Sequence, residues 1–180
     1  MKITPLPEPN KPKYLQELIA DAKNLGAEII NENDGGGTLV DALMVPALLY
    51  PVTGNMRLWH EEQFGPVVPI AVYDNIEEVY DYLARTPFGQ QAAIFTQDPV
   101  QAGPIVDVMS TVVGRVNINT QCGRSPDVFP FSGRRSSAMG TMSVTEALNQ
   151  FSVETVVAAK KNSANEDILL ALKESSNFLQ

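Results

Sequence analysis

Cysteine and histidine are nearly absent from the sequence, with one of each in 180 residues. A single cysteine excludes a disulfide within the chain, and one cysteine with one histidine argues against a structural zinc site. Basic residues are also few, because lysine and arginine number 13 against 21 aspartates and glutamates and leave a formal net charge of -8. This negative balance argues against a nucleic acid or an anionic membrane as the main partner.

The sequence also lacks long hydrophobic runs. No apolar stretch is long enough to span a membrane, and residues 1–5 do not begin the apolar core of a signal peptide. A glycine-rich strand–turn–helix fingerprint for a dinucleotide is missing as well. We therefore expect a cytoplasmic protein whose length suits one domain with a sizeable hydrophobic core.

Hydrophobic periodicity predicts a helix and a short strand near the start of the chain. The proline-rich residues 4–13 should form an extended arm, and the apolar residues from Tyr14 to Leu25 follow helical spacing. Gly26 is expected to cap this helix, and residues 27–30 to form a strand. Three successive glycines lie in the polar segment 31–38, which we interpret as a surface turn because no helix pattern follows it.

The middle of the chain alternates strands with helices. Strands are predicted at residues 67–73, 91–96 and 114–119. A capping-box pattern at 75–78 opens the first helix and Asp98-Pro99 opens the second, within which Pro104 predicts a kink or a late start. Such repeats imply parallel pairing with right-handed crossovers, so the expected fold class is α/β, a parallel-type sheet with flanking helices.

Two acids and an aromatic residue lie just before one of these strands, in Glu61-Glu62-Gln63-Phe64-Gly65-Pro66. The Gly-Pro pair ends the preceding element and places the acids and Phe64 on a loop at a sheet edge, where α/β folds bind ligands. A carboxylate there can accept both hydroxyls of a ribose, and an aromatic face can hold a flat ring. The alternative is a solvated acidic pair with Phe64 filling the core.

A second loop, residues 120–136, is too long and too rich in glycine and proline to be a simple connection. It carries Cys122, Arg124, Asp127 and Phe131. From the residues alone, Arg124 is either a ligand-binding arginine or a surface arginine paired with Asp127.

The first loop resembles the signature of the aldehyde dehydrogenase superfamily, on the pattern Glu-Glu-x-Phe-Gly-Pro-Val followed by Pro-Ile. The resemblance covers nearly everything from about residue 3 to residue 160, and it implies a partial catalytic domain over residues 1–150. It also implies that Glu62 holds the nicotinamide ribose of NADP or NAD and that Phe64 packs near the nicotinamide.

The second loop resembles that of the non-phosphorylating, NADP-dependent glyceraldehyde-3-phosphate dehydrogenases, on the pattern Ile-Asn-Thr-x-Cys-x-Arg-x-x-Asp-x-Phe-Pro-Phe. In that subgroup an arginine of the loop helps to hold the substrate phosphate, and by position it is Arg124. The resemblance places Cys122 and Phe131 in the loop that lines the aldehyde pocket. It departs from the family at residues 134–138, where Arg-Arg-Ser-Ser-Ala replaces a lysine and a Ser-Gly pair.

The resemblance also exposes an absence, because aldehyde dehydrogenases use a cysteine thiolate that precedes the cofactor signature, whereas Cys122 follows it. Nucleophile, general base and cofactor domain would all precede this chain. We therefore expect a C-terminal fragment that is inactive alone. The alternatives are a non-catalytic binding or assembly module that kept the fold, and a cysteine hydrolase using Cys122 and His60, although His60 also fits a packed or capping role.

The end of the chain carries an assembly signal. A short helix is predicted at 144–150, and apolar residues then alternate from Phe151 to Val157. In the family this strand reaches a neighbouring subunit, so residues 151–161 are expected to be a protruding oligomerisation strand through which the protein self-associates. Residues 162–180 are expected to be a tail with a short amphipathic helix at 166–172.

Overall fold

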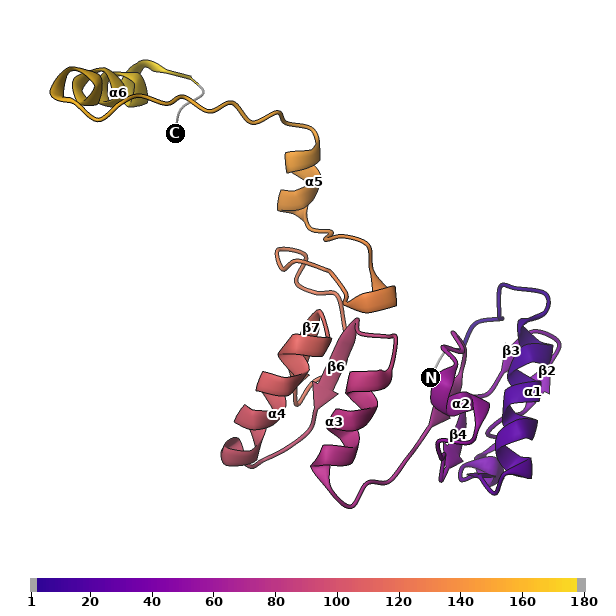
Figure 1. Ribbon diagram of the computed structural model, residues 1–180. Helices are drawn as coiled ribbons and strands as arrows, with labels where there is room; N and C mark the ends of the chain where they lie inside the picture. The colour runs from indigo at the N-terminus through magenta and orange to yellow at the C-terminus, as the bar shows by residue number, and fades with distance from the viewer. Residues whose placement is uncertain (1–2, 178–180) are drawn as a thin grey trace.

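The computed structural model describes residues 3–177 and contains two α/β lobes followed by two separate helices (Figure 1). An extended segment joins the lobes between β5 and α3. In chain order the elements are α1 (Lys11–Asn24), β1 (Glu28–Ile29), η1 (Glu32–Asp34), β2 (Leu39–Val40), β3 (Leu43–Met44), β4 (Ala47–Tyr50), α2 (Arg57–His60), β5 (Val67–Pro69), α3 (Ile76–Arg85), β6 (Gln91–Ile94), α4 (Pro99–Val112), β7 (Arg115–Ile118), η2 (Arg135–Ser137), α5 (Val144–Gln150) and α6 (Ser163–Ser175).

The first lobe packs α1 against a small mixed sheet. The sheet has the order β1-β4-β5, with β1 antiparallel and β5 parallel to the central strand β4. Leu15, Leu18 and Ala22 of α1 are fully buried, as are Ala47 and Leu49 of β4. The predicted apolar stripe of the first helix is thus confirmed as the face that covers the sheet.

The limits of α1 differ from the prediction at one end only. The helix begins at Lys11 instead of Tyr14, because Pro12 is tolerated in the first turn, where the amide hydrogens need no helical partner. At the other end Gly26 has a φ of 101°, which confirms that a glycine in the left-handed region ends the helix. The three glycines lie, as expected, in turns that follow η1.

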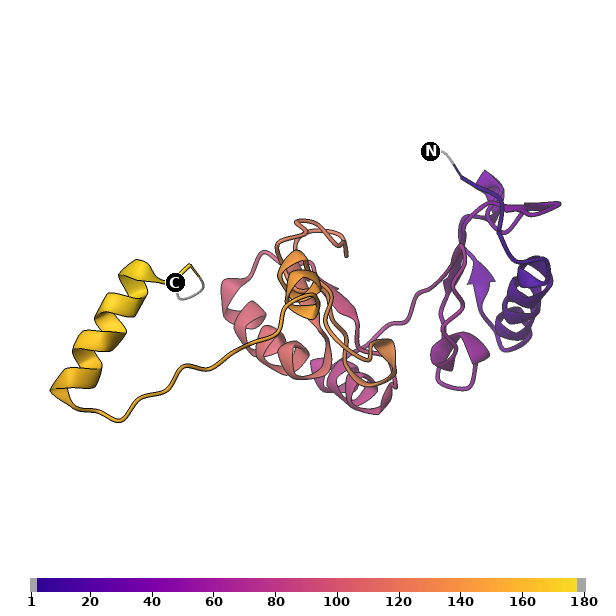
Figure 2. The ribbon, with the colours of Figure 1, turned by 90° about the horizontal axis from the view of Figure 1, so that it is seen from above.

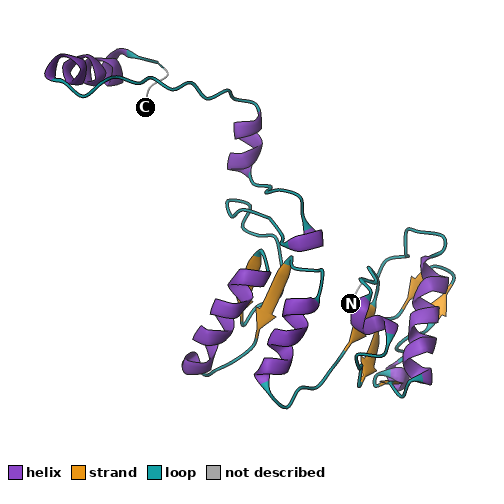
Figure 3. Ribbon diagram, in the orientation of Figure 1, coloured by secondary structure: helices purple, strands orange, loops and turns teal. Residues whose placement is uncertain are grey.

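The second lobe pairs β6 and β7 in parallel, with register Gln91↔Arg115 to Ile94↔Ile118, and places α3 and α4 alongside them (Figure 3). Its core is small and contains Ile94, Met109 and Val113. The capping box of α3 is confirmed, since the side chains of Asn75 and Glu78 each accept a hydrogen bond from the backbone of the first turn.

Of the two outcomes predicted for α4, a kink or a late start, the late start is not found. The Asp98 carboxylate accepts hydrogen bonds from the amides of Val100 and Gln101, at 2.9 and 3.4 Å, and fixes the helix start at Pro99. The helix then continues through Pro104, which has no amide hydrogen to donate to the carbonyl of Val100; both residues are exposed, so water can reach this part of the helix.

Of the three strands predicted to pair in parallel, only β6 and β7 do so. Within residues 3–177, β5 instead lies parallel to β4 in a separate sheet, a pairing that the sequence did not predict. The strand expected over residues 67–73 ends at Pro69. Its partner β4 ends before Pro51, so no strand of the described residues lies beside the chain beyond Ile70, and Val72 and Tyr73 are exposed.

The C-terminal part extends away from both lobes (Figure 2). The predicted helix α5 is confirmed, and α6 is longer than expected at both ends. Residues 152–160 run between them without a ladder partner in the described chain, with Phe151 at 92% and Val153 at 94% exposure. Because strand pairing there needs an edge from another molecule, the oligomerisation strand stays a prediction.

Among the helices of residues 3–177, none combines the length and the apolar character needed to cross a membrane.

Gly65 allows the first loop to lie directly on α1. A Cβ atom at Gly65 would meet Cδ1 of the fully buried Leu15 at 2.6 Å. We expect Gly65→Ala to lower the free energy of unfolding by about 1–3 kcal/mol, because the core has no room for the extra methyl group. Urea unfolding followed by circular dichroism measures this change.

Gly140→Ala is the matched control, since a Cβ at this position meets no atom within 4 Å beyond its two chain neighbours and Gly140 has no positive φ. It should leave stability unchanged or raise it by up to about 1 kcal/mol, because alanine reduces the freedom of the unfolded chain. Equal effects of the two substitutions would show that close packing on Leu15 is not what requires Gly65.

Candidate functional site

The first candidate site is the loop of residues 61–66, which runs from the end of α2 to β5. Burial alternates along it, because Glu61 and Gln63 are partly buried whereas Glu62 and Phe64 are exposed. The Phe64 ring is 73% exposed, so the alternative in which Phe64 fills the core is wrong. Among the described residues the Glu62 side chain forms no hydrogen bond or ion pair. An acid and an aromatic ring are therefore both available to a ligand.

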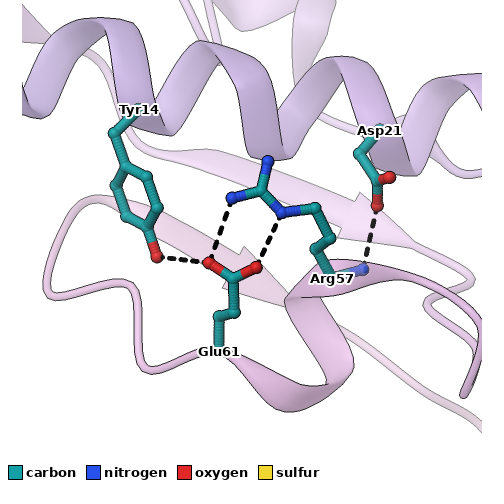
Figure 4. A network of polar contacts seen from close by, with 4 residues as sticks. All are labelled: Tyr14, Asp21, Arg57 and Glu61. Atoms are coloured by element: carbon teal, nitrogen blue, oxygen red, sulfur yellow. Dashed lines mark hydrogen bonds and ion pairs between the residues drawn. The ribbon is translucent and has the colours of Figure 1, made fainter.

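A polar network holds Glu61 against α1 (Figure 4). Tyr14 donates from Oη to Glu61 Oε2 at 2.8 Å. Arg57 donates from Nε to Oε1 at 2.6 Å and from Nη2 to Oε2 at 3.2 Å. The backbone amide of Arg57 donates in turn to Asp21 Oδ2 at 2.9 Å. Two residues of α1 thereby fix both the start of α2 and the acid that precedes Glu62.

The network favours the ionised form of Glu61. The hydrogen bond from Arg57 lowers the pKa of the Glu61 carboxyl, and its partial burial, which acts in the opposite direction, is the smaller effect. The pKa of Tyr14 is raised, first by burial of the phenol and then by its hydrogen bond to Glu61. Glu61 is consequently a structural anion, and Glu62 is the acid that is free to bind.

The rest of the loop is anchored on both sides of Phe64. The Lys11 ammonium donates to the carbonyl of Gln63 at 3.2 Å, and the Gln63 side chain donates to the carbonyl of Val67 at 2.7 Å. Between these anchors Phe64 has a φ of 43°, in the left-handed region that bulky side chains rarely adopt. Such strain persists only where the surroundings fix the backbone, and it is concentrated at functional sites.

The second candidate site is the loop that follows β7, and its start is fixed by the buried Asn117. The Asn117 amide donates to the carbonyl of Ala92 at 3.0 Å and to Gln91 Oε1 at 3.3 Å, and it contacts Cys122 Sγ at 3.8 Å. Gln91 Oε1 also accepts from the backbone amide of Gly123 at 3.1 Å. The exposed Cys122 is therefore held at the end of the β6–β7 sheet.

Another arginine, Arg115, fixes the backbone on both sides of Arg124. Arg115 donates to the carbonyls of Gly123 and Ser125, both at 2.9 Å, on either side of Arg124. The Arg124 guanidinium lies 5.2 Å from the centre of the Phe131 ring, a cation–π contact. No ion pair joins Arg124 to Asp127 in the described chain, so the guanidinium keeps its donors available.

A cavity of about 240 Å³ opens beside this arginine. Arg124 and Asp127 line its polar side, and Phe129, Met142 and Val144 line its apolar side. Two antiparallel hydrogen bonds between Phe131 and Met142, at 2.7 and 2.8 Å, close the loop behind the cavity. The lining thus combines a guanidinium, a carboxylate and an apolar wall, a mixture that suits a small polar organic molecule whose anionic group contacts Arg124.

The structure joins some of the predicted residues and leaves others apart. It brings Arg124 onto Phe131, and it places Glu62 two residues from Phe64 on one exposed loop. No hydrogen bond, ion pair or ring contact of residues 3–177 links the two loops. Their candidate residues therefore form two half-sites, one on each lobe.

Cys122 and His60 are not brought together. The His60 ring bonds to the carbonyl of Gly54 at 2.7 Å, whereas the Cys122 sulfur contacts Asn117. The structure thus gives the cysteine hydrolase no support. Across residues 3–177, no group of three or more histidine, cysteine or acidic side chains could hold a metal ion.

The sequence did not predict the residues that hold the two loops in place, which are Tyr14, Arg57, Gln91, Arg115 and Asn117. Arg57 and Glu61 stand at i and i+4, which is a recognisable ion-pair spacing. Tyr14 lies 47 residues from Glu61, and no local pattern connects the two.

The class of protein follows from the comparison with family models. The model of the aldehyde dehydrogenase family matches residues 1–157, so the chain belongs to the aldehyde dehydrogenase family.

Individual relatives show which members of the family the chain is similar to. The chain is 37% identical over 147 residues to the NADP-dependent glyceraldehyde-3-phosphate dehydrogenase of Arabidopsis thaliana, and the aligned region covers 82% of this chain and 28% of that protein. It is 34% identical over 158 residues to the Streptococcus equinus enzyme of the same name, with 88% and 31% covered. The NADP complex of the Bacillus halodurans enzyme superposes with a TM-score of 0.74 at 36% identity, covering 81% of this chain and 29% of that one. The chain thus spans less than a third of the length of these relatives.

The Glu61 network predicts a dependence of stability on pH. Because the folded state lowers the pKa of Glu61 from its ordinary value of 4.5, the ionised acid adds stability above that value, and this contribution is lost as the pH falls through the lower, folded pKa. Glu61→Gln should therefore be less stable than the unchanged protein at neutral pH, with the difference vanishing in acid. Urea unfolding over a series of pH values measures it.

Glu62→Gln is the matched control, since it changes the neighbouring acid, which has no partner in the described structure. Its stability should follow that of the unchanged protein at every pH. A Glu61→Gln defect that persists undiminished in acid would contradict the assigned role of the carboxylate.

Proposed function

We propose that this chain forms the nicotinamide-contacting and substrate-contacting part of an NADP-dependent aldehyde dehydrogenase that oxidises glyceraldehyde 3-phosphate to the carboxylic acid. The observation that carries the proposal is the Arg124 guanidinium, which lies over Phe131 beside an open cavity and has no carboxylate partner among the described residues. The names of the relatives in Arabidopsis thaliana and Streptococcus equinus support the same substrate and cofactor.

Glu62 and Phe64 fit the nicotinamide end of NADP. The exposed Glu62 carboxylate has two oxygens free to accept hydrogen bonds from neighbouring ribose hydroxyls. The exposed Phe64 ring offers a flat apolar surface to the nicotinamide. When bound, NADP supplies the hydride acceptor. The contribution of Glu62 and Phe64 is to hold it in place and to orient it.

Arg124 fits the phosphate of the substrate. Its stacking on Phe131 holds the guanidinium plane, and charge-assisted bonds to a phosphate are stronger than those between neutral groups. Cys122 and Phe131 belong to the same loop as Arg124, and in this proposal they contact the rest of the aldehyde. The thiolate that attacks the aldehyde, forming a thiohemiacetal and then a thioester, lies in this proposal outside residues 1–180, so the chain alone is inactive.

Assembly and location complete the proposal. The exposed segment 151–161 pairs with a second subunit and makes the enzyme an oligomer. The enzyme works in the cytoplasm. The exposed apolar side chains of the segment support the first statement, because an edge of this kind is normally covered.

Substrate recognition can be tested in a chimera in which this chain replaces the matching C-terminal part of the Bacillus halodurans enzyme. The chimera should reduce NADP with glyceraldehyde 3-phosphate. Arg124→Leu should raise the KM for this substrate by about ten- to a hundredfold, the equivalent of losing about 1.5–3 kcal/mol of charged hydrogen bonding. An uncharged short aldehyde should be nearly unaffected, and steady-state kinetics with both substrates provide the comparison.

Arg134→Leu is the control, because Arg134 is an exposed arginine of the same loop whose side chain has no bonded partner in the described structure. It should leave both KM values unchanged. If Arg124→Leu raises the KM for both substrates alike, or for neither, the assignment of Arg124 to the substrate phosphate fails. A well-folded chimera without turnover on any aldehyde would favour the non-catalytic module.

Self-association can be tested on the chain itself. Phe151 and Val153 occupy one side of the alternating segment, and their replacement by serine should convert a dimer or larger species into a monomer because the buried apolar area is lost. Light scattering coupled to size exclusion measures the change. The paired control Ser152→Asn with Glu154→Gln alters the other side and should preserve the assembly; a monomeric unchanged protein would refute the proposal.

A further inference from the structure

The network around Glu61 lies beside the cofactor-binding residues without containing either of them. Glu61 receives three hydrogen bonds, one from Tyr14 and two from Arg57, and these fill both of its carboxylate oxygens. Glu62 follows it directly and is exposed. The network therefore acts on the part of the backbone from which Glu62 and Phe64 project.

We propose that Tyr14 and Arg57 are positioning residues for the cofactor: by holding Glu61 against α1 they present Glu62 and Phe64 to the nicotinamide end of NADP. This inference rests on the proposed function of Glu62 and Phe64. Neither positioning residue is assigned a contact with the cofactor or the aldehyde.

The geometry shows why the loop needs such a hold. Only four residues separate the end of α2 from Gly65, and Gly65 lies against the buried Leu15 of α1. Between these points the carbonyl of Gln63 is fixed by Lys11, and Phe64 is kept at a φ of 43°. A strained residue relaxes when its surroundings loosen. Release of Glu61 would therefore let Phe64 leave the conformation in which its ring is presented.

The three anchors on α1 lie along one side of the helix. Lys11 holds Gln63, Tyr14 holds Glu61, and Asp21 holds the amide of Arg57. Figure 4 shows Tyr14 and Asp21 projecting from the same helix toward the α2 turn and Glu61. The buried leucines of α1 fix this helix on the sheet. Because the loop is bonded to α1, the hydrophobic core also holds the loop backbone in place.

Tyr14→Phe is the sharpest variant, since it removes one hydroxyl and keeps the ring. Arg57→Met removes both bonds to Glu61 and keeps the length of the side chain. In the 180-residue chain, both variants should speed hydrogen exchange of the bonded amides at the two ends of the loop, Glu61 and Val67, and leave the central amides of α1 as protected as before. Lys23→Met is the control, because it breaks the 3.6 Å ion pair of α1 with Glu32, away from this loop.

The chimera tests the consequence for the cofactor. Misplacement of binding groups by about 1 Å can cost on the order of a hundredfold, so Tyr14→Phe and Arg57→Met should lower kcat/KM for NADP by about ten- to a hundredfold. The KM for glyceraldehyde 3-phosphate should stay constant, because Arg124 is held by Arg115 on the other lobe. Arg57→Lys, which keeps the charge and one donor direction, should restore part of the NADP effect.

The two measurements separate the possible failures. Unchanged exchange at the amides of Glu61 and Val67 in both variants would overturn the positioning role, whatever the cofactor site proves to be. A loss that raises both KM values together would also overturn it, because general destabilisation would explain it. If Glu62→Gln leaves the KM for NADP unchanged in the chimera, the proposed function of Glu62 fails, and the exchange experiment shows separately whether the network holds the loop.

Discussion

The packing of α1 on β4 is the constraint on which the first lobe depends. Leu15, Leu18 and Ala22 on the helix and Ala47 and Leu49 on the strand are all fully buried, and Met44, Met56 and Val67 belong to the same core. Because β1 and β5 pair with β4 on either side, the contact between α1 and β4 also sets the positions of these two strands. The loop that carries Glu62 and Phe64 enters β5, so its position is set by the same contact.

Both candidate half-sites use an arginine to fix the residue next to the one that would bind. Arg57 holds the Glu61 side chain and leaves Glu62 exposed. Arg115 holds the carbonyls on either side of Arg124 and leaves its guanidinium on Phe131. A guanidinium suits this task because its planar fork makes two directed hydrogen bonds at once. Each loop thus gains a defined backbone without using the side chain that the proposed function assigns to the ligand.

The half-sites also differ in the kind of surface they offer. The first lobe offers a carboxylate and an aromatic ring, which match ribose hydroxyls and a flat heterocycle. The second offers a guanidinium and a carboxylate beside an apolar cavity wall, and the guanidinium suits a phosphate group. The proposed function uses both surfaces, one for the nicotinamide and one for the phosphorylated aldehyde, in a chain that belongs to the aldehyde dehydrogenase family.

Local patterns in the sequence determined the helices, their caps and the two loops. The stripe of α1, Gly26, the capping box of α3 and the limits of α5 all depend on residues within a few positions of one another. Tertiary structure alone decided the separation into two lobes, because the length of β5 depends on where its partner β4 ends. Arg57 lies four residues before Glu61, a spacing that suggests an ion pair from sequence. Only the tertiary structure shows that Glu61 is the structural acid and Glu62 the available one, because the packing of α1 brings the Tyr14 hydroxyl, 47 residues away along the chain, onto the Glu61 carboxylate beside Arg57.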